Sequence, residues 1–197
     1  MTASVNNTAD VTNVKGVSGG YGFSAPVGTA AGTEQDHFAT LVGYDNMGFI
    51  SSDGVEESIE ADKVEVTDIN GDVIFVAKSK ETETIKLTLT GLTAESLKEW
   101  HGHANVDDSA AGYTKVTHTA AEHSERSYVF DFVLKDARRW RKHVPNGKVT
   151  EVGPIVHGSG SVVAREITIT CSPDATGARV YDYIQKRGTG SSGVVGA

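Results

Sequence analysis

The chain has 197 residues and a mass of 20.8 kDa, of which 38% of residues are hydrophobic and 22 are glycines. Its net charge of −8 and pI near 5.3 argue against a protein that grips nucleic acid, because phosphate binding needs a basic face. No segment approaches the roughly 20 consecutive apolar residues of a membrane helix, and the N-terminus lacks the pattern of a secretory signal. We therefore expect one soluble β-rich domain that is made in the cytoplasm and does not contact a membrane.

Residues 1–15 are polar and lack hydrophobic periodicity, which predicts an arm that is mobile in the isolated monomer. The following segment Val17–Ser24, VSGGYGFS, predicts a glycine-rich strand that is closed by Pro26 and Gly28.

Two short motifs near this strand resemble enzyme signatures. Residues 16–20, GVSGG, match a nucleophile elbow around Ser18, and residues 20–25, GYGFSA, match a dinucleotide fingerprint. Both motifs need a helix directly after the glycines, and Pro26 and Gly28 prevent one. We predict no catalytic residue and no cofactor here.

Residues 49–75 hold eight carboxylates against the single base Lys63, in a segment that reads as strand. The carboxylates are Asp53, Glu56, Glu57, Glu60, Asp62, Glu65, Asp68 and Asp72. The pair Asn70-Gly71 between apolar runs predicts a hairpin tip with a type I′ turn, which needs positive φ at both residues. DINGD from Asp68 resembles half of a calcium loop, but Val73 and Ser79 stand where that loop needs Gly and Glu. The hairpin is the favoured interpretation.

The next segment predicts a strand followed by a short helix. In residues 82–90, TETIKLTLT, period-two alternation places Glu83, Ile85, Leu87 and Leu89 on one face, and the strand ends at Gly91. In residues 93–100, TAESLKEW, Thr93 is the predicted N-cap and Glu95 an acid in the first turn, with Leu97 and Trp100 on one face. This is the one helix that the pattern supports firmly.

Residues 102–125 form a long polar loop with several histidines. His101 and His103, with His118 and His123 downstream, could in principle supply a three-histidine metal site in a β-barrel. His101 lies at a helix end and the later histidines lie in a polar loop, so we predict solvated histidines and no metal.

The C-terminal third predicts further antiparallel strands and a basic cluster. Residues 126–134, 148–156 and 161–170 read as strands separated by PNG and GSG turns, and Cys171 reads as a packed core thiol. Residues 178–187, ARVYDYIQKR, fit a helix or a strand and slightly favour a helix, and the tail 188–197 is expected to be flexible. The fold class is therefore mainly β, an antiparallel sandwich or barrel with one flanking helix.

The basic cluster lies in residues 135–143, KDARRWRKH, where Arg138, Arg139, Arg141 and Lys142 surround Trp140. Phosphate contacts are one interpretation. In an acidic chain we favour an inter-subunit contact with the carboxylates of residues 53–72 on a neighbouring copy.

With these segments in view, the chain resembles a major tail tube protein of a long-tailed bacteriophage of the kind seen in phages of actinobacteria. The resemblance is carried, in the expected order, by SDGVEESIEADKVEVTDINGDVI from Ser52, SKETETIKLTL from Ser79, RSYVFDFVL, RRWRKHVPNGKVTEVG, and ITITCSPDATGARVYDYI up to Ile184.

The resemblance implies a β-sandwich protomer that assembles as sixfold rings, stacked into a hollow tube through which the genome passes. It implies a non-enzymatic virion protein without cofactors, no additional C-terminal immunoglobulin-like domain, and partners that include tape measure, tail terminator and distal tail proteins. Tubes of contractile tails and secretion systems have a similar fold and stay open as an alternative. The implied division is an arm at 1–15, a tube domain at 16–187 with the loop 102–125, and a tail at 188–197.

The resemblance suggests why the chain carries so many carboxylates. Duplex DNA carries one negative charge per roughly 1.7 Å, so a basic channel would retain it, whereas carboxylates repel it and allow it to slide without specific binding. Our candidates for the channel lining are Glu56, Glu57, Glu60 and Asp62. A small metal-dependent barrel enzyme that uses the 101–123 histidines, or a monomeric binding module, are the rival hypotheses.

Overall fold

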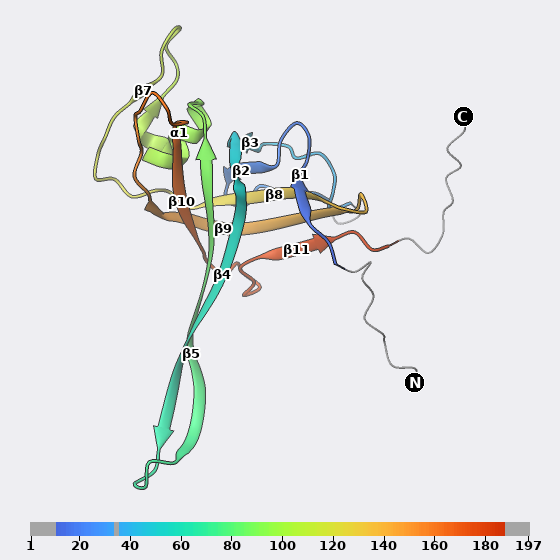
Figure 1. The fold of residues 1–197 in the computed structure, drawn as a ribbon, viewed down its shortest axis with the longest axis vertical. Coiled ribbons are helices and arrows are strands. Elements are labelled where there is room, and N and C mark those ends of the chain that lie inside the picture. Colours follow the sequence, from blue (N-terminus) through green and yellow to red (C-terminus); the bar gives the residue numbers. More distant parts are fainter. Residues whose placement is uncertain (1–10, 34–35, 188–197) are drawn as a thin grey trace.

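The computed structural model describes residues 11–33 and 36–187 (Figure 1). In chain order its elements are β1 (Val14–Gly16), β2 (Gly22–Pro26), β3 (Asp45–Asn46), β4 (Phe49–Thr67), β5 (Val73–Thr90), α1 (Ala94–His101), the 3₁₀ helix η2 (His103–Asn105), β6 (Val106–Asp107), β7 (Lys115–Val116), β8 (Arg126–Leu134), β9 (Arg139–Val152), β10 (Ala164–Cys171) and β11 (Tyr181–Ile184). Within these described ranges, no helix is long and apolar enough to cross a bilayer.

Among the described residues, nine strands form one antiparallel sheet in the order β3-β2-β8-β9-β10-β5-β4, with β1 added to β8 and β11 added to β9. The long strand β9 joins two halves, since its first part pairs with β8 and β11 and its last part with β10. In Figure 1, β8 and β9 run across the view whereas β4, β5 and β10 run along it. The sheet therefore bends at β9 into two layers with crossing strands, which is a β-sandwich.

The core lies between the two layers because alternate residues of the strands point inward. β5 contributes the buried residues predicted at Ile85, Leu87 and Leu89, and β10 contributes Ile167 and Ile169. From the crossing layer Tyr128, Phe130 and Val144 join this core cluster, and Val149 joins it from the part of β9 that pairs with β10. Cys171 completes this cluster as a buried thiol, as predicted, and burial raises its pKa to about 12.

Helix α1 begins at the predicted N-cap. The backbone N–H of Ser96 donates to Thr93 Oγ1 at 3.1 Å, and the N–H of Thr93 donates to Ser96 Oγ at 3.0 Å, which closes a capping box. Trp100 is only 2% exposed and packs into the core, while Leu97 packs beside it. The predicted helix is confirmed, and it ends at Gly102, whose φ of +89° favours glycine.

The hairpin is confirmed at residues 68–72, between β4 and β5, but the turn type was predicted wrongly. Gly71 has φ +89°, whereas Asn70 is not among the residues with positive φ. Instead the Asp68 carboxylate accepts hydrogen bonds from the N–H groups of Asn70 and Asp72, both at 2.9 Å. A side-chain cap at Asp68 therefore replaces the second left-handed residue.

Three other expectations are corrected. Residues 145–147 do not reverse the chain but lie inside β9, where a bulge opposite Arg126 marks the change of partner from β8 to β10. Gly147 is needed there, because a Cβ would lie 2.8 Å from Ile169 Cγ2. The first glycine-rich strand begins at Gly22, after a turn at 17–20. Residues 181–184 form strand β11, not a helix.

The terminal predictions fall largely outside the described residues, namely 1–10 of the arm and 188–197 of the tail. At the end of the predicted arm, Val14 and Lys15 belong to β1 and pair with Leu134 and Val133.

Candidate functional site

A polar face covers the side of β4, β5, β10 and the end of β9 that points away from the core. The pairing of β4 with β5 places Glu56 opposite Lys86, and the pairing of β5 with β10 places Lys86 opposite Thr168. We call this surface the polar face; it consists of Glu56, Ser58, Glu60, Asp62, Lys80, Thr82, Thr84, Lys86, Thr88, Lys148, Thr150, Glu151, Glu166, Thr168 and Thr170. The face exists because each of these strands alternates a core residue with a threonine or a charged residue.

The polar face is acidic, with five carboxylates against three ammonium groups. Lys86 pairs with Glu166 at 3.1 Å, and this contact raises the pKa of Lys86. Lys148 pairs with Glu122 of the long loop. These two contacts neutralise most of the positive charge. Glu60 and Glu151 remain around a shallow hollow of about 230 Å³ that is otherwise lined by threonines.

Three of the four predicted channel residues share this face, and the fourth does not. Glu56, Glu60 and Asp62 are at alternate positions of β4, whereas Glu57 lies opposite Ile85 on the core side. Its carboxylate accepts a hydrogen bond from Lys142 Nζ at 2.7 Å. The sequence-based set included both Glu56 and Glu57, which period-two alternation does not allow on one face.

Glu57 belongs to a charge cluster around the buried Lys142 at the root of the hairpin. Lys142 is 4% exposed and also donates to Asp182 at 2.9 Å. Glu83 is 8% exposed beside them. Burial and the hydrogen bond with Glu57 raise the pKa of Glu83 to about 7. For Glu57, burial acts to raise the pKa, but the hydrogen bond from Lys142 lowers it below its ordinary value. Near neutral pH Glu83 is therefore partly protonated beside an ionised Glu57.

The basic cluster predicted to reach a neighbouring copy makes most of its contacts within the protomer. The guanidinium of Arg141 is buried, binds Asp131 through two contacts of 2.6 Å, and donates to the carbonyls of Ala31, His37 and Ala39. Lys142 is held in the cluster described above. Arg138 and Arg139 keep more exposure, with contacts to Asp136 and to the Phe38 carbonyl. We therefore retain only Arg138 and Arg139 as inter-subunit candidates.

A second buried carboxylate, Glu99, ties helix α1 to the sheet. Glu99 accepts hydrogen bonds from Ser24 Oγ at 2.7 Å and Tyr128 Oη at 3.1 Å, and lies 3.1 Å from His103 Nε2. Burial acts to raise its pKa, but these partners hold that pKa below its ordinary value. Glu99 was not among the predicted site residues, although its place next to Trp100 in an amphipathic helix was a signal.

The four histidines of the metal hypothesis do not meet at one point. His101 and His118 contact edge to face with ring centroids 4.6 Å apart, whereas His103 contacts Glu99. Burial lowers the pKa of His101 and of His123. Among residues 11–33 and 36–187, no three side chains of metal-binding type lie close enough together to hold an ion.

Solved structures to which the chain is distantly similar belong to an anti-feeding prophage and to an extracellular contractile injection system. The tube-terminating cap of the anti-feeding prophage is 14% identical, with a TM-score of 0.45 over 90% of this chain and 98% of that chain. A sheath-tube complex of the extracellular contractile injection system PVC is 13% identical, with a TM-score of 0.44 over 84% and 89% of the two chains. A comparison with curated proteins found no match.

The family model described as phage tail tube protein matches residues 6–192, which is nearly the whole chain. This match, and not the distant structural likenesses, decides the assignment. The β-sandwich with one flanking helix agrees with it. The chain belongs to the phage tail tube protein family and is a structural component of a virion tail.

Proposed function

We propose that this protein assembles as stacked hexameric rings whose polar faces line a channel for double-stranded DNA. The observation that carries the proposal is the difference between the two sides of the β4-β5-β10 layer. One side is the core, covered by β8, β9 and helix α1, and the other is the polar face. When such a layer closes into a barrel, the covered side faces outward and the polar face faces the channel.

Open strand edges support ring closure. β4 pairs with β5 on one edge, and within the described residues nothing pairs with its other edge. At the opposite side of the layer, β9 beyond Gly147 pairs with β10 alone. An edge of this length is an aggregation hazard unless a partner covers it. Pairing of β4 of one copy with the end of β9 of the next closes the layer into a continuous barrel.

In this role the protein is made in the host cytoplasm, has no catalytic task, and meets tape measure, tail terminator and distal tail proteins. The arm 1–15 and the loop 102–125 become ordered between rings, where a partner surface offsets the roughly 1 to 2 kcal/mol that ordering each residue costs. The DNA slides past the polar face without specific contacts.

The test is charge reversal on the polar face. The triple variant E56K, E60K and D62K is expected to form normal tubes but to slow DNA ejection from virions, because lysines bind phosphates. The control is D45K, which changes an exposed acid of β3 outside both the polar face and the long loop. Measurement of DNA release by fluorescence at two salt concentrations gives the rate. An ejection rate equal to wild type in the triple variant contradicts the channel assignment.

A further inference from the structure

The long loop between α1 and β8 folds back on itself, and its second half contacts the body through side chains. The first half forms the β6–β7 hairpin, in which Val106 pairs with Val116. This hairpin ends where the N–H of Thr117 donates to the Asn105 carbonyl at 2.8 Å. We call the remaining residues 118–125 the return limb. Among the described residues, the return limb makes no backbone-to-backbone hydrogen bond, so its position depends on its side chains.

Two histidines and one glutamate hold the return limb. His118 contacts His101, the last residue of α1, edge to face with ring centroids 4.6 Å apart. Glu122 pairs with Lys148 of β9. The side chain of His123 is half-buried. The ring contact and the burial both favour uncharged histidines, because taking an imidazolium out of water costs more than taking out a neutral imidazole.

The groups around these histidines are mostly basic. Arg165 of β10 lies beside His101, with its Nη1 atom 3.5 Å from His101 Nε2. The other groups whose charge acts on His101 are His118 and His123. The charged and titratable groups that act on His123 are Glu99, His103, Lys148 and Arg165. A proton taken up by any of these histidines therefore comes close to permanent cations.

The two carboxylates in this region already have partners. Glu99 is held by the three contacts described above, and Glu122 is held by Lys148. Neither is left to compensate an additional positive charge. Burial, and after it the neighbouring imidazole and guanidinium groups, lowers the pKa of His101. Burial also lowers the pKa of His123, although Glu99 opposes this effect.

These directions fix the sign of the pH dependence. A histidine that is free of such contacts has an ordinary pKa of about 6.5. In the closed arrangement His101 and His123 bind protons less readily than that, so their contribution to closure is fully present above pH 6.5 and is lost as the pH falls further. Proton uptake and release of the return limb are therefore linked.

We propose that the return limb is a pH-sensitive latch, which is closed over the end of α1 at neutral pH and opens when His101, His118 and His123 take up protons. The latch works within one protomer and does not depend on assembly into a tube. For the loop 102–125, it narrows the ordering expected from assembly to the largely exposed hairpin tip 108–113. Opening uncovers the end of α1 and the guanidinium of Arg165, so acidification changes the surface presented here.

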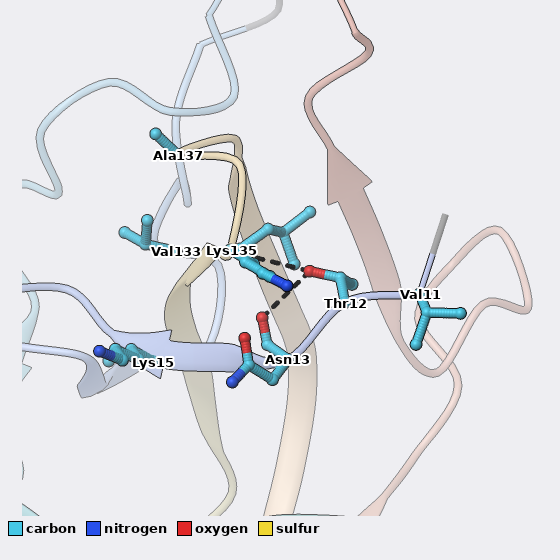
Figure 2. A pocket seen from close by; sticks show the side chains of 9 residues that line it. Val11, Thr12, Asn13, Lys15, Val133, Lys135 and Ala137 are labelled. Atoms are coloured by element: carbon cyan, nitrogen blue, oxygen red, sulfur yellow. Dashed lines mark hydrogen bonds between the residues drawn. The ribbon is translucent and has the colours of Figure 1, made fainter. Parts of the chain in front are cut away.

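Nuclear magnetic resonance of the full-length monomer tests the latch. We expect backbone order parameters of the return limb of about 0.85 at pH 7.5, falling below about 0.6 at pH 5. The internal reference is β1, which borders a hollow whose lining holds two lysines but no histidine (Figure 2). Because histidine is the side chain that ordinarily titrates in this pH range, β1 is expected to stay ordered. A return limb that is equally ordered at both pH values overturns the proposal.

Glutamine substitutions identify the groups responsible. The triple variant His101→Gln, His118→Gln and His123→Gln is expected to keep the return limb ordered at pH 5, because glutamine takes up no proton. The matched control is His157→Gln, which changes an exposed histidine outside the loop and is expected to open like wild type. Opening of the triple variant to the wild-type extent at pH 5 overturns the proposal.

Ring titrations of the wild type decide the case if the triple variant is already mobile at pH 7.5. The midpoints at which the rings of His101 and His123 gain protons are expected to coincide with the loss of order in the return limb. A limb that stays ordered after both rings are protonated overturns the latch. Because these measurements use the monomer, their outcome is separate from that of the test of the DNA channel.

Discussion

The two halves of strand β5 share one backbone but differ in surroundings. From Glu83 to Thr90 the strand pairs on both edges and buries every second side chain, whereas from Val73 to Thr82 it pairs with β4 alone and its apolar side chains are exposed. Buried apolar area stabilises the monomer. Exposed apolar area of the same chemistry lowers the free energy only when a second molecule covers it. The root of the hairpin therefore contributes to the folding core, whereas its outer half leaves apolar surface uncovered in the protomer.

The largest expected effect on stability is in the root. Ile85→Ala removes a fully buried side chain between β5 and the crossing layer. We expect a loss of about 2 to 5 kcal/mol in the free energy of unfolding, because a cavity remains. Urea denaturation of the monomer measures it. A loss below 0.5 kcal/mol would mean that this half of the strand is not part of the folding core.

The charge cluster between the two halves is expected to make stability depend on pH. Glu83 has a folded pKa near 7, above the ordinary value of 4.5, so its proton stabilises the fold below pH 4.5 and this contribution is lost as the pH rises through 7. The full difference between these two pKa values corresponds to about 3 kcal/mol, and solvent screening of the partly exposed cluster reduces the expected change to on the order of 1–2 kcal/mol.

Glu83→Gln removes this dependence, and the comparison is with Glu81→Gln, a half-buried neighbour whose pKa is lowered by the hydrogen bond from Lys78. Unfolding free energies measured between pH 4.5 and 8 give the result. If the unfolding free energy of the Glu83→Gln variant depends on pH as strongly as that of the wild type, the raised pKa of Glu83 is not the cause of the dependence.

The smallest expected effect on the monomer lies in the outer half. Phe75 is 57% exposed and lies opposite Val66. Phe75→Ala is expected to change monomer stability by less than about 0.5 kcal/mol, as surface substitutions usually do. Tube yield, measured by sedimentation, should nevertheless fall about tenfold or more. Equal losses in stability for Phe75→Ala and Ile85→Ala would remove the distinction between the halves.

Local periodicity made much of this architecture predictable. Alternation in residues 82–90 identified the buried face of β5, Thr93 identified the start of α1, and Asn70-Gly71 identified the hairpin tip. The predictions failed where tertiary pairing decides the outcome. Residues 145–147 look like a turn but bend a continuous strand, and residues 181–184 become a strand because β9 offers them an edge.

The candidate site was predictable only in part. Acidity of β4 was evident from composition, but which carboxylates share a face depends on register, and Glu57 turned inward to Lys142. The partners of Arg141 are carbonyls from residues 31–39, about 100 positions away in sequence, which no local pattern indicates. The burial of Glu99 likewise depends on Ser24 and Tyr128 from other strands.

The central claim is that the polar face of the β4-β5-β10 layer lines the channel of a tube. Cryo-electron microscopy of tubes grown from the purified protein, or of virion tails, tests it most directly. We predict stacked rings with Glu56, Glu60 and Asp62 at the inner wall. A tube with these carboxylates on its outer surface, or no tube at any protein concentration and in no virion tail, would contradict the account.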